Sequence, residues 1–150
     1  MRIDYIHRSR RSKVPPKRSE PVYVPVFPKW LRYAGAVCCA LVILYASVIE
    51  PGDSVPRTLF GIGFTVYLHA IAYAVLTAMI GYATLSADRR TLLTAVAVAT
   101  LYGAGIELLQ GTIAYRTMDA GDVLINAVGA ICGAGLWWVT ASQLDPDRLR

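Results

Sequence analysis

The sequence predicts an all-α membrane protein, a bundle of four transmembrane helices with both termini in the cytoplasm. Hydrophobic residues make up 55% of the 150-residue chain and charged residues only 17%. This composition is too apolar for a soluble domain of that length. The apolar residues gather in four runs, and most of the positive charge lies on one side of these runs. The length is that of a single domain.

The four apolar runs cover residues 30–49, 59–85, 92–110 and 122–142. Each is near the roughly 20 residues that a helix needs to cross the hydrocarbon core. The connections between them are short, as they are between antiparallel neighbours in a bundle. We therefore expect one transmembrane domain over residues 29–143, preceded by a tail at 1–28 and followed by a short tail at 144–150.

The distribution of basic residues predicts the orientation. Nine of the fifteen lysines and arginines lie within residues 1–32. Four more would face the same side, in the second connection and the C-terminal tail: Arg89, Arg90, Arg148 and Arg150. Only Arg57 and Arg116 would lie on the other side. Because basic loops stay inside, we expect both termini in the cytoplasm and the loop around Arg116 outside.

The N-terminal tail is basic and then proline-spaced, with PVYVPVFP from Pro21. It is expected to be a mobile or polyproline-like arm. One interpretation is attraction to anionic lipid headgroups, at about 1 kcal/mol per basic residue near the surface. The other is a topogenic signal that only holds the N-terminus inside. Nucleic acid also attracts basic runs, but we do not expect it as a partner here.

Polar residues in the last two spans mark a candidate binding site. Gly103, Glu107 and Gln110 are spaced by four and three residues, so they share one helix face. Asp122 and Asn126 are spaced by four on the next span. An ionisable group within a membrane span is by default a candidate functional residue. We therefore expect these side chains to face a shared polar site.

The second span and the last connection add further candidates. Thr65, His69 and Tyr73 follow one another at spacings of four and form a polar stripe. The connection after the third span carries Arg116 and Asp119. Together with the polar residues of the last two spans, they are expected to line a funnel open to the outside.

Small residues at helical spacing predict close helix packing. They lie on the third and fourth spans: Ala95, Ala99, Gly103, Gly129 and Gly133. Such faces let helix backbones approach closely in lipid.

Each polar residue also has a structural interpretation. Glu107 and Arg116 would form an ion pair that latches the outer loop, since charges within a membrane pair with one another. Asp119 and Asp122 have the spacing of a capping box at the start of the fourth helix. Asn126, like the histidine of the second span, would hydrogen-bond between helices.

No sequence pattern indicates a cofactor. Cys38, Cys39 and Cys132 lie within spans, and their spacing suggests neither a disulfide nor a zinc site. There is no phosphate-binding loop. The sequence therefore predicts no cofactor and no bound metal.

Three segments resemble one family: HAIAY at 69–73, YGAGIELLQ at 102–110 and YRTMDAGDVLINAVGA at 115–130. The order His-x3-Tyr, Glu-x2-Gln, Arg, Asp-x3-Asn-x2-Gly is similar to that of the VanZ-like family of small polytopic membrane proteins. The resemblance covers about residues 59–140. Family members usually carry an Asp-Lys pair just before the histidine, where this chain has Thr65 and Val66.

The resemblance implies a multi-pass protein of the plasma membrane. The family is named after an accessory protein of glycopeptide resistance that lowers sensitivity to teicoplanin. The first hypothesis is therefore a non-enzymatic envelope protein that binds, shields or moves a lipid-linked molecule or glycan through its outward polar cluster.

Two alternative hypotheses remain. In an intramembrane enzyme acting on an envelope lipid, Glu107 or Asp122 would be general base or metal ligand, His69 a proton shuttle and Arg116 a phosphate clamp. The lack of a nucleophile–base signature favours a non-enzymatic role. The second alternative is an accessory subunit, in a homo-oligomer or a complex, whose glycine faces pack against another membrane protein.

Overall fold

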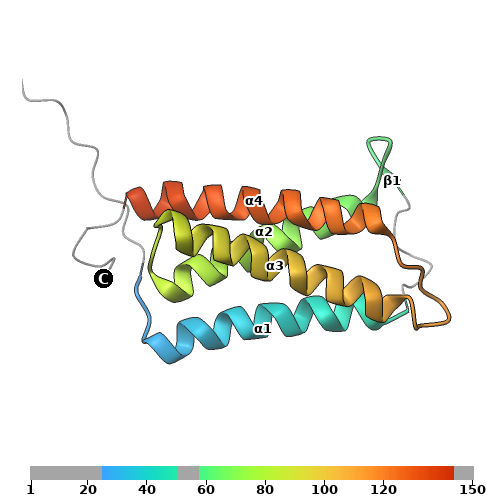
Figure 1. The fold of residues 1–150 in the computed structure, drawn as a ribbon, viewed down its shortest axis with the longest axis horizontal. Helices are drawn as coiled ribbons and strands as arrows, with labels where there is room; N and C mark the ends of the chain where they lie inside the picture. The colour runs from blue at the N-terminus through green and yellow to red at the C-terminus, as the bar shows by residue number, and fades with distance from the viewer. Residues whose placement is uncertain (1–24, 51–57, 144–150) are drawn as a thin grey trace, which may run out of the picture.

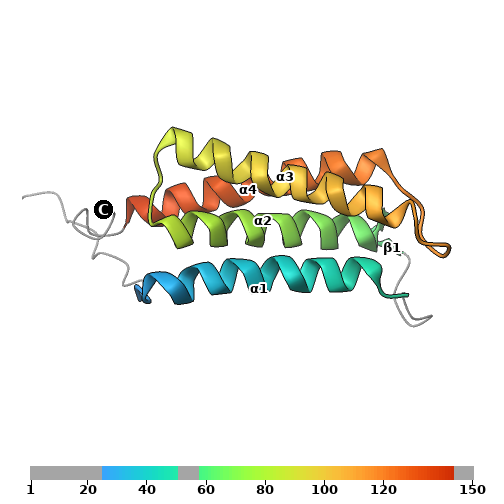
Figure 2. The same cartoon turned by 60° about the horizontal axis from the view of Figure 1, so that its bottom comes forward.

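The computed structural model describes residues 25–50 and 58–143. Four long helices make up most of the described part: α1 (Lys29–Val48), α2 (Phe64–Thr84), α3 (Arg89–Gln110) and α4 (Ala120–Ser142). All four are long and apolar enough to cross a membrane. They lie side by side as a bundle, and α1 begins at the end of the bundle where α4 ends (Figure 1 and Figure 2). The prediction of an all-helical chain with four such helices is confirmed.

The start of the second span was predicted wrongly. Residues 59–63 do not begin the helix, because β1 (Thr58–Leu59) and β2 (Ile62–Gly63) pair as an antiparallel hairpin before α2. Phe60 and Gly61 form its turn with φ angles of 50° and 79°. A two-residue hairpin turn of type I′ requires a positive φ at both positions. A short apolar run does not reveal by itself whether it is strand or helix.

Two other predictions concern residues outside the described part. Residues 1–24, the basic portion of the N-terminal tail, lie outside the described part, and so does the C-terminal tail at 144–150. The domain boundaries and the cytoplasmic location of the termini stay predictions.

Helices α2 and α4 approach each other closely along the glycines of α4. A Cβ atom on Gly129 would overlap the carbonyl oxygen of Ala70, and one on Gly133 would overlap that of Ala74. On α3, small residues are equally enclosed: Ala95 is 1% and Ala99 0% exposed. These glycine faces therefore contact helices of their own chain and are not free to pack against another membrane protein.

A buried indole ring lies at the end of the bundle where α1 begins. We call this end of the bundle the Trp137 end. Trp137 is 4% exposed. Its ring lies where a side chain on Gly81 would be, and its Nε1 donates a 2.8 Å hydrogen bond to the carbonyl of Ser86. Arg32 donates to the last carbonyls of α2, those of Tyr82 and Ala83, at 3.2 and 2.6 Å. The guanidinium therefore supplies donors to carbonyls in the last turn of α2, where a helix end lacks them.

Asp88 begins α3 at the same end. Its carboxylate accepts from the backbone N–H groups of Arg90 and Thr91 at 2.9 and 3.0 Å, as an N-cap residue does. Hydrogen bonds from the hydroxyls of Ser86 and Thr91, and then from backbone N–H groups, hold the pKa of Asp88 well below its usual range.

Candidate functional site: a polar cluster at the end of the bundle

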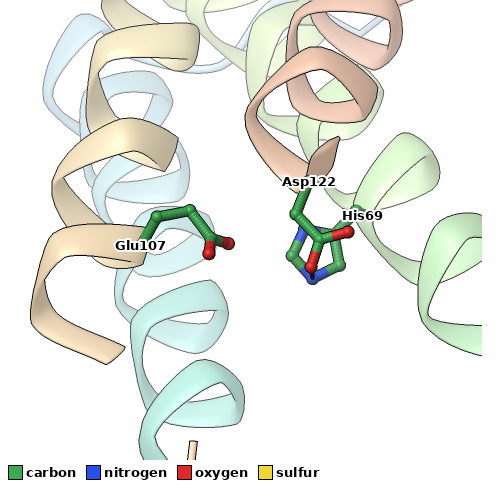
Figure 3. Close-up of side chains that lie close together, drawn as sticks. All are labelled: His69, Glu107 and Asp122. Atoms are coloured by element: carbon green, nitrogen blue, oxygen red, sulfur yellow. Dashed lines mark ion pairs between the residues drawn. The ribbon is translucent and has the colours of Figure 1, made fainter. Parts of the chain in front are cut away.

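The opposite end of the bundle contains a cluster of polar side chains from three helices, which we call the polar cluster: His69, Glu107, Asp122 and Asn126. His69 Nε2 lies 3.6 Å from Asp122 Oδ2. Figure 3 shows the Glu107 carboxylate pointing from α3 toward the His69 and Asp122 side chains, which come from α2 and α4. Among His69, Glu107 and Asp122, one ligand atom of each lies within 4.8 Å of the other two.

The His69 ring is held by Asn126. The ring Nδ1 lies 2.9 Å from Asn126 Oδ1. An amide oxygen only accepts, so Nδ1 is the donor in this contact, and Nε2 is the ring nitrogen that faces Asp122. Asn126 is itself fully enclosed, with 0% exposure. A Cβ on Gly103 would lie 2.7 Å from its Nδ2, so the amide occupies the space that this glycine leaves.

Glu107 is buried, with 2% exposure. Its Oε2 accepts a 3.0 Å hydrogen bond from the backbone N–H of Asp119. Its Oε1 has no hydrogen-bond partner in the described part of the chain. A buried carboxylate oxygen without a partner is energetically costly.

The hydrogen bonds at the start of α4 explain why the Asp122 side chain is free to face His69. Asp119 is the N-cap and accepts from Gly121 N at 2.7 Å, as the predicted cap would. In a capping box, the residue three positions later reaches back to the N-cap N–H. Here Glu107 of α3 takes that N–H instead. Asp122, which would have been the reciprocal cap, faces His69.

Arg116 does not form the predicted ion pair with Glu107. The described structure contains no such pair, and Arg116 Nη2 donates to the carbonyls of Ala46 and Ile49 at the end of α1. The last turn of α1 has no basic residue of its own. Its free carbonyls therefore take donors from elsewhere, and Arg116 supplies one.

Two further residues bind the same helix end. Gln110 donates to the carbonyl of Ser47 at 2.9 Å, and the Tyr115 hydroxyl donates to that of Val48 at 2.6 Å. Gln110 was a predicted site residue, but Tyr115 was not. The sequence offered little to predict this contact except that Tyr115 stands beside Arg116. Its acceptor is a backbone carbonyl, and every residue has one, so the acceptor leaves no pattern in the sequence.

A cavity of about 420 Å³ lies between α1, α2 and the end of α3. Its wall is largely apolar, and the predicted polar stripe of Thr65, His69 and Tyr73 lines it. Arg116 lines it too, and the Nε of Arg116 is buried without a partner in the described residues. His69 therefore belongs both to the cavity and to the polar cluster.

The fold and the site together define a class, the small polytopic membrane proteins with polar side chains near one end of a four-helix bundle. A family model described as VanZ/LLP1 matches residues 36–141. The chain therefore belongs to the VanZ/LLP1 family. The match confirms the predicted relationship and extends it into α1. No curated protein and no solved structure matches the chain.

Proposed function

We propose that this VanZ/LLP1 protein is an integral protein of the plasma membrane that binds, shields or moves a lipid-linked molecule of the cell envelope. The proposal is carried by the cavity of about 420 Å³ with Arg116 in its lining. The basic residues favour an orientation in which this end of the bundle faces outward. In that orientation the cavity opens where envelope precursors are handled.

The chemistry of the cavity supports a ligand with an apolar chain and an anionic group. Its volume lies within the roughly 300 to 1,000 Å³ range of small-molecule sites. Val42, Leu68 and Ala72 offer apolar contacts to an acyl or isoprenoid chain. The unpartnered Nε of Arg116 is a charged donor that suits a phosphate or carboxylate oxygen.

Native mass spectrometry of the purified full chain tests this proposal. Wild-type protein is expected to retain a lipid adduct. Ala46→Phe, which fills the cavity from α1, should lose it. Ala97→Phe makes the same substitution at an exposed alanine on α3 that does not line the cavity, and it should retain the adduct. Equal adducts in both variants, or none in wild type, would count against the cavity as the binding site.

The family relationship suggests a cellular readout. In a glycopeptide-sensitive bacterium, expression of the chain should lower sensitivity to teicoplanin, and expression of Ala46→Phe should not. Unchanged sensitivity in cells that display the wild-type protein would separate this chain from the resistance role for which the family is named.

Intramembrane catalysis on an envelope lipid is the second candidate function. It is favoured by the position of His69, which lines the cavity and lies 3.6 Å from Asp122. A histidine placed between a carboxylate and a bound molecule is able to transfer a proton. Turnover of envelope lipids by purified protein, abolished in His69→Gln, would place the chain among enzymes.

A further inference from the structure

We propose that His69, Glu107 and Asp122 bind a divalent transition-metal ion, for which Zn²⁺ is the best match, and that Asn126 positions the His69 ring for this role. Their ligand atoms lie within 4.8 Å of one another. The three residues come from three different helices, so an ion between them would join α2, α3 and α4. This inference does not rest on the proposed function.

The donor set is one imidazole nitrogen and two carboxylate oxygens. These are ordinary zinc ligands, with metal–ligand distances of about 2.0–2.2 Å. Around a tetrahedral ion of that size, neighbouring ligand atoms are about 3.3 Å apart. The 3.6 Å separation of His69 Nε2 and Asp122 Oδ2 is already close to this value. Glu107 has the longest and most flexible of the three side chains, and its ligand atom needs to move inward by no more than about 1.5 Å.

The unpartnered oxygen of Glu107 is the independent observation that points to a ligand. The side chain is 98% enclosed, since its exposure is 2%. Its Oε1 has no partner among the described residues, and Figure 3 shows the carboxylate directed at His69 and Asp122. A divalent cation would satisfy this oxygen and compensate two neighbouring carboxylates in an apolar bundle. A proton or a water molecule would satisfy the oxygen alone, and the experiment below separates these cases.

Asn126 gives His69 the hydrogen bond to the second ring nitrogen that metal-binding histidines have. Such histidines hydrogen-bond through their other ring nitrogen, which fixes the tautomer and the ring orientation. The 2.9 Å contact between Nδ1 and Asn126 Oδ1 leaves Nε2 free to coordinate. Three protein ligands leave one tetrahedral position open, as in catalytic zinc sites. Because His69 also lines the cavity, a bound ion would lie beside any molecule held there.

The test uses the full chain in detergent, stripped with a chelator and then titrated with Zn²⁺ alone. Calorimetry and elemental analysis after gel filtration should give one ion per chain. Glu107→Gln and Asp122→Asn should each weaken binding by at least about 100-fold, and Asn126→Ala by about 10- to 100-fold. Asp88→Asn makes the same substitution at the Trp137 end, where Asn remains a good N-cap, and should bind like wild type.

Two results would overturn the proposal. One is a wild-type chain that binds no Zn²⁺ and whose unfolding temperature does not rise when Zn²⁺ is added. This result needs no variant to fold. The other is equal affinity in Glu107→Gln and Asp88→Asn, which would assign the ion to other groups. Ala46→Phe should keep the metal while losing the lipid, so failure of the metal site and failure of the cavity are distinguishable.

Discussion

The two ends of the bundle satisfy their polar groups very differently. At the Trp137 end, the indole N–H, the Arg32 guanidinium and the Asp88 carboxylate all have partners. In the described part of the chain, five buried side-chain polar atoms lack one. Two are threonine hydroxyls within α2 and α3, and the other three belong to Glu107, Arg116 and Asn126 at the polar-cluster end.

This difference in hydrogen bonding suggests that the two ends have different roles, one in stability and one in binding. An unsatisfied buried polar group costs about 1–3 kcal/mol, and more when it is charged. A bundle selected for stability alone would fill these positions with apolar or fully bonded side chains. Unsatisfied groups gathered at one end, beside a cavity, are typical of a site that gives up stability for binding. The predictions below follow from the contrast, in order of decreasing effect on stability.

The largest effect is expected at the packed end. Trp137→Ala removes a buried ring and its hydrogen bond, and should lower the free energy of unfolding by about 3–5 kcal/mol. The measurement is unfolding by denaturing detergent in mixed micelles. Trp138→Ala is the matched control, because the neighbouring indole is 57% exposed. Similar losses in the two variants would show that the buried ring of Trp137 contributes no more to stability than an exposed indole does.

The contact of α2 with α4 gives the next effect. Gly133→Ala places a methyl group against the carbonyl of Ala74, and overpacking of this kind costs about 1–3 kcal/mol. Gly135→Ala, two residues further on, meets nothing within 4 Å. It should leave stability unchanged or raise it, since alanine favours the helix by about 1 kcal/mol over glycine. The same unfolding assay measures both variants.

A smaller effect is expected where the loop between α3 and α4 meets α1. Tyr115→Phe removes the hydroxyl that donates to Val48, so it should cost about 0.5–1.5 kcal/mol. Tyr45→Phe removes an exposed hydroxyl that has no hydrogen bond in the described structure, and should change stability less. If the two substitutions have equal effects, the loop does not latch α1 through this bond.

The Asp88 cap predicts a pH dependence at the Trp137 end. Because the folded-state pKa of Asp88 is lowered, its stabilising effect is complete above the usual aspartate value and is lost as the pH falls through the folded-state pKa. The difference in unfolding temperature between wild type and Asp88→Ala should therefore be largest at neutral pH and shrink below about pH 4. A difference that does not vary with pH would show that the carboxylate charge is unimportant there.

Much of this arrangement was predictable from the sequence because it depends on spacing along helices. Hydrophobic runs predicted four helices, and spacings of three and four put Glu107, Asp122 and Asn126 on inward faces. The partners of Arg116 were not predictable, since it bonds to backbone carbonyls of α1. It was also not predictable that the N–H of Asp119 would donate to Glu107 and not to Asp122. This outcome depends on how closely α3 approaches the start of α4.

The central claim is that Glu107 is buried for function and not for stability, and the free energy of unfolding of metal-free Glu107→Gln tests it most directly. The amide oxygen of glutamine still accepts the Asp119 N–H, while the buried charge and its repulsion of Asp122 are removed. We predict that stability is unchanged or raised by about 1 kcal/mol. A loss of about 2 kcal/mol or more would contradict the account and make the carboxylate a structural latch.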